Sequence, residues 1–147
     1  MKKLYTITAA TTLALALVGC TSNNSNVAMN KAASTLNVKE VCSVEKNGIN
    51  KVLATATTYN KIAKKHGVEY RRLGMTTAQY ITAAKAAVKS GAKRVVLLNK
   101  KAKPTKNSVT TSYAAWRGCT FAVSALQLEA QAKQNWREAV PGDKFKY

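Results

Sequence analysis

Few residues of this 147-residue chain are of types that carry out chemistry on a substrate. The chain has three cysteines, Cys20, Cys42 and Cys119, one histidine, His66, and six Asp and Glu residues. One histidine and six scattered carboxylates do not supply the ligand clusters of zinc or calcium sites, so we expect no metal. No thiol-peptidase motif flanks Cys42 or Cys119, and the chain lacks the common nucleophile, phosphate-binding and metallopeptidase motifs. The sequence therefore predicts no catalytic residue and no cofactor.

The N-terminal 19 residues have the parts of a secretory signal peptide. Lys2 and Lys3 give a positive start, and an apolar run over residues 7–18 follows. This run is shorter than the roughly 20 residues that a membrane span needs. It ends in Leu17-Val18-Gly19-Cys20, which resembles the lipobox of bacterial lipoproteins.

The resemblance covers residues 1–20 and implies that the signal peptide 1–19 is removed. Cys20 would then carry a thioether-linked diacylglycerol and an acylated amine, which together anchor a protein far more strongly than one acyl chain. Thr21 stands where this family places Asp to retain a lipoprotein in the inner membrane. We therefore expect a protein of the bacterial cell envelope that is lipid-anchored in the outer membrane and faces the periplasm. Residues 20–35 would form the lipidated cysteine and a flexible tether, and residues 36–147 a single domain.

With Cys20 assigned to lipid, Cys42 and Cys119 remain as a pair in an oxidising compartment. Such a pair most simply forms one disulfide. The alternative, a nucleophilic cysteine assisted by His66, is disfavoured because His66-Gly67 has the pattern of a helix end. The disulfide would close a loop between residues 77 positions apart.

Apolar residues recur at helical spacing in three segments, which predicts a mostly α-helical fold. The first spans residues 48–66, with Asn47 or Asn50 as the expected N-cap. The second begins with a capping box at Thr76-Thr77-Ala78-Gln79 and ends at Ser90-Gly91. The third runs from about residue 112 to 137, and its broad apolar face predicts a central helix packed on more than one side.

In the segment 94–111, the residues Arg94-Val95-Val96-Leu97-Leu98 fit either a short buried strand or the start of a helix, because periodicity cannot distinguish the two over five residues. Val109 and its β-branched neighbours could pair with 94–98 in a short β-hairpin. Between them, Lys100–Lys106 contains Pro104 and is expected to be an exposed loop.

Positive charge is concentrated in the middle of the chain. Residues 61–106 contain 13 Lys and Arg but one Glu, within a chain whose formal net charge is +18. Because like charges one helical turn apart repel each other, helix stability does not explain this pattern. These candidate anion-binding residues are Lys61, Lys64, Lys65, Arg71, Arg72, Lys85, Lys89, Lys93, Arg94, Lys100, Lys101, Lys103 and Lys106.

Two functions fit these features. The first is a non-enzymatic outer-membrane lipoprotein whose basic face, residues 61–106, binds or scaffolds anionic envelope components such as lipopolysaccharide or peptidoglycan. The second is an accessory or adaptor lipoprotein that docks a protein partner of an envelope complex, its charge being a solvated surface. Nucleic acid is disfavoured as a partner, because the compartment is wrong and no nucleic-acid-binding motif occurs.

Overall fold

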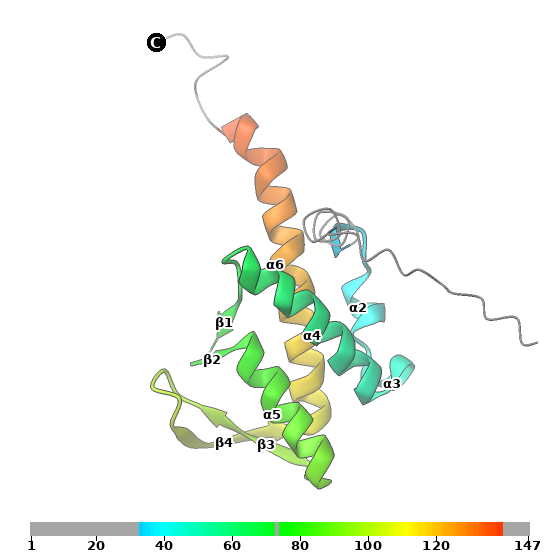
Figure 1. Cartoon of the computed structure of the whole chain (residues 1–147), viewed down its shortest axis with the longest axis vertical. Helices are drawn as coiled ribbons and strands as arrows, with labels where there is room; N and C mark the ends of the chain where they lie inside the picture. The colour runs from blue at the N-terminus through cyan, green and yellow to red at the C-terminus, as the bar shows by residue number, and fades with distance from the viewer. Residues whose placement is uncertain (1–32, 73, 140–147) are drawn as a thin grey trace, which may run out of the picture.

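The structure is a computed structural model that describes residues 33–72 and 74–139. It confirms a mostly helical domain with one disulfide and a short β-hairpin (Figure 1). Along the chain the elements are α2 (Val38–Val41), α3 (Val44–Asn47), α4 (Ile49–Lys65), β1 (Arg71–Arg72), β2 (Met75–Thr76), α5 (Thr77–Ser90), β3 (Arg94–Leu98), β4 (Pro104–Thr110) and α6 (Thr111–Ala139).

The long helix α6 is the central element, as its broad apolar face predicts. In Figure 1 it runs the length of the domain, with α4 and α5 lying against it. Its buried residues are mostly small, which lets the neighbouring helices approach closely. Gly118 shows this most clearly, since a Cβ atom there would stand 2.9 Å from Ile81 Cγ1 of α5. The glycine inside a helix is thus explained by the close α5–α6 contact.

The hydrophobic core lies between α6 and the two helices that cover it. The largest fully buried side chains include Met75, Leu126, Val52 and Val123. Ala33 is also fully buried and packs in a cluster with Ile62 and Leu126. The described packing therefore includes Ala33, which precedes the expected start of the domain at residue 36.

The helix ends match the sequence for α5 but not for α4. Thr76 and Gln79 form the predicted capping box, and Gly91 ends α5 in the left-handed conformation with φ 70°. At α4, however, Gly48 is the N-cap and no side chain caps the helix, so the prediction of Asn47 or Asn50 was wrong. The Asn47 amide instead donates a hydrogen bond to the Glu40 carbonyl at 2.7 Å, because α3 holds Asn47 next to the end of α2.

Residues 94–98 form a strand rather than a helix start. β3 pairs with β4 in an antiparallel ladder in which Val95 faces Val109. Pro104 opens β4, so the expected loop over Lys100–Lys106 is shorter than predicted. Proline is tolerated there because the first residue of an edge strand need not donate to the ladder.

The predicted Cys42–Cys119 disulfide is present, with the two Cα atoms 5.5 Å apart. Cys42 follows α2 and Cys119 lies in α6, and both side chains are fully buried. The bond therefore holds the N-terminal helices against the central helix.

None of the described helices has a stretch long and apolar enough to cross a membrane. The expected signal peptide, Cys20 and the tether as far as residue 32 lie outside the described residues.

Replacing Cys42 and Cys119 together by alanine should lower the free energy of unfolding by up to about 4.5 kcal/mol. The unfolded chain then regains the freedom of a loop closed between residues 77 apart. Urea denaturation followed by circular dichroism measures the loss. A reducing agent should produce a similar loss in the unmutated chain. Identical unfolding midpoints with and without reductant would show that the bond does not stabilise the fold.

Candidate functional site

All 13 cations of the predicted basic face are exposed. The structure distributes them over three places rather than one continuous face: the helices α4 and α5, strand β1, and the β3–β4 hairpin with the residue before it. In chain order, α4 and α5 carry Lys61, Lys64, Lys65, Lys85 and Lys89, β1 carries Arg71 and Arg72, and the hairpin region carries Lys93, Arg94, Lys100, Lys101, Lys103 and Lys106.

Two hollows lie between α4 and α5, because each helix packs mainly on α6. The first has a volume of about 310 Å³, with Lys61 and Lys64 from α4 and Lys85 from α5 around it. The second, of about 270 Å³, is lined by Lys85 and Lys89. Lys85 lines both, so the two hollows are neighbours. We call this feature the lysine groove and define it by Lys61, Lys64, Lys85 and Lys89.

The positions of these lysines follow from helix geometry. Lys85 and Lys89 are one turn apart on α5, and Lys61 and Lys64 are nearly so on α4, so each pair projects from one side of its helix. Within the described residues, no carboxylate lies within ion-pair distance of any of the four. The positive field of the lysine groove is therefore not neutralised by the protein itself.

Apolar side chains and one buried amide complete the first hollow. Ile81 and Ala78 line it together with Asn60, whose side chain is 4% exposed. Asn60 Nδ2 donates a hydrogen bond to Glu69 Oε1 at 2.9 Å, whereas its Oδ1 accepts none. An unpaired buried acceptor costs about 1–3 kcal/mol. The hollow thus combines three ammonium groups at its rim with apolar side chains and a buried amide beneath them.

Glu69, the acidic residue within the basic segment, is already engaged. Its Oε1 also accepts a hydrogen bond from the Ala78 backbone N–H at 2.8 Å, at the start of α5. The Glu69 carboxylate therefore accepts a hydrogen bond from a backbone N–H that has no partner within α5, and it does not serve as a counter-ion to the lysines.

Two turns that carry or adjoin several of the other cations lie against each other. A Cβ atom at Gly74, between β1 and β2, would stand 2.6 Å from the Asn99 carbonyl carbon of the hairpin turn. That turn is ordered by Asn99, whose Oδ1 accepts hydrogen bonds from the backbone N–H groups of Lys101 and Lys103. Arg94 is less free, because its guanidinium donates two hydrogen bonds to Ser108 at 2.9 Å each.

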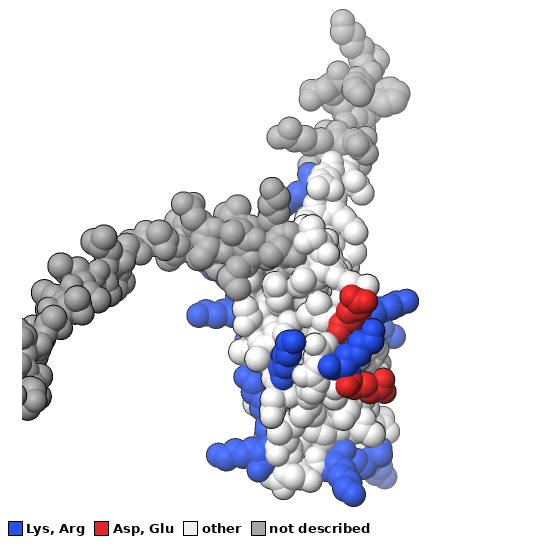
Figure 2. Space-filling model, turned by 90° about the vertical axis from the view of Figure 1, so that its right-hand side faces the viewer, with Lys and Arg blue, Asp and Glu red and all other residues white. Residues whose placement is uncertain are grey.

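The side of the domain that carries α2 and α3 differs in charge. Figure 2 looks onto this side and shows broad uncharged surface, with acidic side chains in red next to cations in blue and further cations at the edges and lower end. Glu40 in α2 and Glu45 in α3 are exposed. This side therefore carries charges of both signs.

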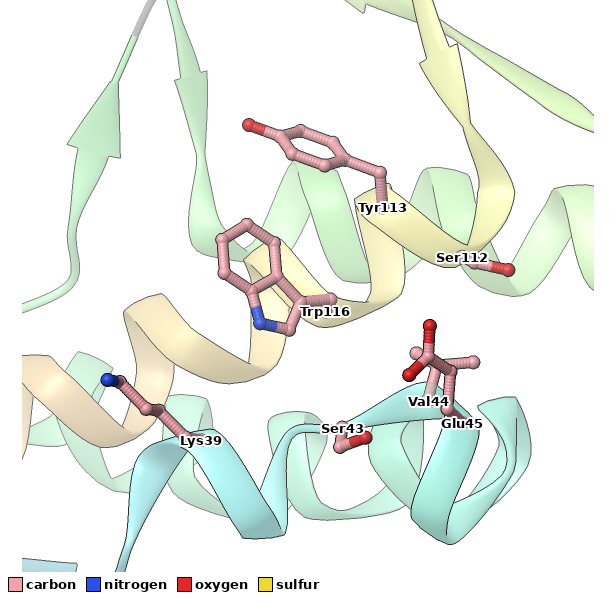
Figure 3. Close-up of a pocket in the computed structure, with 7 residues that line it drawn as sticks. All are labelled: Lys39, Ser43, Val44, Glu45, Ser112, Tyr113 and Trp116. Carbon is pink, nitrogen blue, oxygen red and sulfur yellow. The ribbon is translucent and has the colours of Figure 1, made fainter.

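A third hollow, of about 460 Å³, lies on this second side (Figure 3). Tyr113 and Trp116 project into it from the start of α6, and α2 and α3 form its opposite wall. The Trp116 side chain is half-buried. Helical periodicity cannot distinguish a core residue from one at the edge of the core, so this hollow could not be predicted from the sequence.

His66 ends α4, as predicted, but it has a second role. Its Nδ1 donates a hydrogen bond to Glu129 Oε2 at 2.8 Å, and Lys133 also contacts the Glu129 carboxylate. Burial alone would raise the pKa of Glu129 and is the largest influence on it. The hydrogen bonds from Lys133 and His66 outweigh burial, so this pKa lies below its ordinary value.

No group of three or more His, Cys, Asp and Glu side chains able to hold a metal occurs among residues 33–72 and 74–139. No protein-family model, curated protein or solved structure matches this chain. The function is therefore argued from the geometry of these surfaces.

Replacing Glu129 by Gln should destabilise the domain by about 1 kcal/mol near neutral pH, because it removes a carboxylate that accepts a hydrogen bond from His66 at the end of α4 and forms an ion pair with Lys133 of α6. Folding lowers the pKa of Glu129. The carboxylate therefore stabilises the folded state at a pH above its ordinary pKa, and this stabilisation disappears as the pH falls through the pKa of the folded state. Urea denaturation from pH 7 to pH 3 tests this: the two proteins should converge at the acidic end. Glu40→Gln, at an exposed carboxylate, serves as the control. A constant difference at every pH would contradict the ionic explanation.

Proposed function

We propose that this protein is a non-enzymatic, lipid-anchored protein of the bacterial outer membrane that binds an anionic envelope polymer through the lysine groove. One observation carries the proposal: Lys61, Lys64 and Lys85 surround a single hollow, with no carboxylate of the described residues in ion-pair distance. The lipid anchor on Cys20 is supported by the lipobox resemblance.

The chemistry of the first hollow suits phosphate or carboxylate groups on a sugar backbone. Lysine ammonium groups are mobile point charges that attract such anions without demanding one geometry. Lipopolysaccharide and peptidoglycan both carry anionic groups on a sugar backbone.

The tether limits where the groove can act. Twelve residues lie between Cys20 and Ala33, where the packed domain has begun. At full extension this segment spans roughly 45 Å. Gln127 of α6 fixes this end of the domain by donating hydrogen bonds to the carbonyls of Ala33 and Leu36, at 3.1 and 2.8 Å. The lysine groove would thus work close to the membrane surface that holds the lipid.

The adaptor function is the second candidate. Leu128 on α6 is 49% exposed, as is Val96 of β3. Exposed apolar side chains suit contact with a protein partner, whose binding would resist high salt.

A co-sedimentation experiment separates these functions. The chain from residue 21 onward is mixed with lipopolysaccharide vesicles or with purified sacculi at 50 mM and 500 mM salt. We expect binding at low salt to at least one of the two, and its loss at high salt. The double variant Lys61→Glu/Lys85→Glu should weaken this binding at least tenfold.

The matched control is Lys46→Glu/Lys51→Glu, which changes the net charge equally at two exposed lysines outside the groove. It should weaken binding much less. Equal weakening by both variants would show that net charge alone is responsible and that the lysine groove is not a site. Salt-resistant retention of a single envelope protein would favour the adaptor function.

A further inference from the structure

The hollow between the N-terminal helices and the start of α6 has the composition of a ligand site rather than of a packing defect. Its volume of about 460 Å³ lies in the range of small-molecule pockets, roughly 300–1,000 Å³. The residues around it come from three helices and are Lys39, Ser43, Val44, Glu45, Ser112, Tyr113 and Trp116. We call it the Trp116 hollow.

Two aromatic rings form one wall of the Trp116 hollow. The Tyr113 and Trp116 ring centroids are 5.3 Å apart and their planes are inclined by 47°. The Arg117 guanidinium lies over both rings, 5.8 Å from the Tyr113 centroid and 5.7 Å from the Trp116 centroid. Tyr113 is nevertheless 39% exposed, so the part of its ring that Arg117 leaves uncovered can contact a ligand. Because the planes are inclined, the rings do not form a parallel slot for a flat ring such as a nucleobase. They suit a puckered ring whose C–H groups pack against both faces.

Polar groups stand around these rings. Among the described residues, the Lys39 ammonium, the Glu45 carboxylate, the Ser112 hydroxyl and the Trp116 indole N–H take part in no hydrogen bond or ion pair with the protein. Figure 3 shows the indole nitrogen on the side of Ser43 and Lys39, facing the opposite wall of the hollow. Donors and an acceptor thus line the same hollow as the rings.

This combination excludes several ligand classes. An acyl chain would remove water from Lys39 and Glu45 without replacing their hydrogen bonds, which is costly. The two residues also have opposite charges, so the hollow does not attract an anion as the lysine groove does. Its walls are helical and offer no free strand edge for an extended peptide.

We propose that the Trp116 hollow binds an uncharged pyranose sugar, as one or two rings of a glycan. A pyranose has an apolar C–H face that packs on Tyr113 and Trp116. Its equatorial hydroxyls donate to the Glu45 carboxylate and accept from Lys39 and the Trp116 N–H. This site is independent of the lysine groove, because it recognises the sugar ring and not its charge.

Tryptophan fluorescence tests the proposal. The chain has two tryptophans, so in a Trp136→Phe background the emission reports on Trp116 alone. The chain from residue 21 onward retains every described residue and is titrated at 500 mM salt with N-acetylglucosamine and glucose trisaccharides, both uncharged. We expect a saturable change in emission with at least one of them, and a shift of the Trp116 indole N–H signal in NMR spectra.

The Tyr113→Ala variant should weaken this binding about tenfold, and Glu45→Gln should also weaken it. Tyr70→Ala is the matched control, since Tyr70 is equally exposed at 39% but does not line the hollow. Near-UV circular dichroism confirms that each variant is folded. The proposal is overturned by the absence of any saturable change up to 20 mM sugar, or by equal weakening in the Tyr113 and Tyr70 variants. A negative result would not affect the proposal for the lysine groove, because the titration uses uncharged sugars at high salt and so does not test binding by charge.

Discussion

The close packing of α4 and α5 on the small-residue surface of α6 is the constraint on which the rest of the structure depends. Gly118 and the buried alanines of α6 let the covering helices approach, and Ile81 fills the space above Gly118. The same helix holds the other parts of the fold. Cys119 binds α2 through the disulfide, and Thr111 joins the hairpin region through a hydrogen bond from its Oγ1 to the Ala92 carbonyl at 2.6 Å.

This arrangement also creates the lysine groove. Two helices that each pack on a third, central helix meet less closely with each other, and their outer edges leave a channel. Because the core sides of α4 and α5 are taken up by α6, the lysines on both helices are left at the rim of that channel. The like charges repel one another, and the fold tolerates this since packing on α6 stabilises the helices more than the repulsion destabilises them.

The two candidate sites have opposite electrostatic character. The lysine groove has an unbalanced positive field and an apolar floor, which favours a charged polymer held by mobile contacts. The Trp116 hollow is lined by Lys39 and Glu45, which have opposite charges, and by two aromatic rings. It therefore favours a ligand recognised by its shape and hydrogen bonds rather than by its charge. They lie on different helices, so a glycan polymer that carries anionic groups could be held at both without competition between them. Such two-point binding would exceed the affinity of either site.

The sequence by itself determined the features that depend on local spacing or on pairing by elimination. The capping box at Thr76 and Gln79, the ends at Gly67 and Gly91, the central helix and the Cys42–Cys119 disulfide all follow from short-range patterns or from the cysteine count. The tertiary structure alone decided which side chains far apart in sequence meet. His66 and Glu129 form a hydrogen bond although they are 63 residues apart, and Lys39 and Trp116 line the same hollow. No local sequence pattern links the two residues of either pair. Helical spacing shows which residues share a face, but which neighbour covers that face depends on how the helices pack.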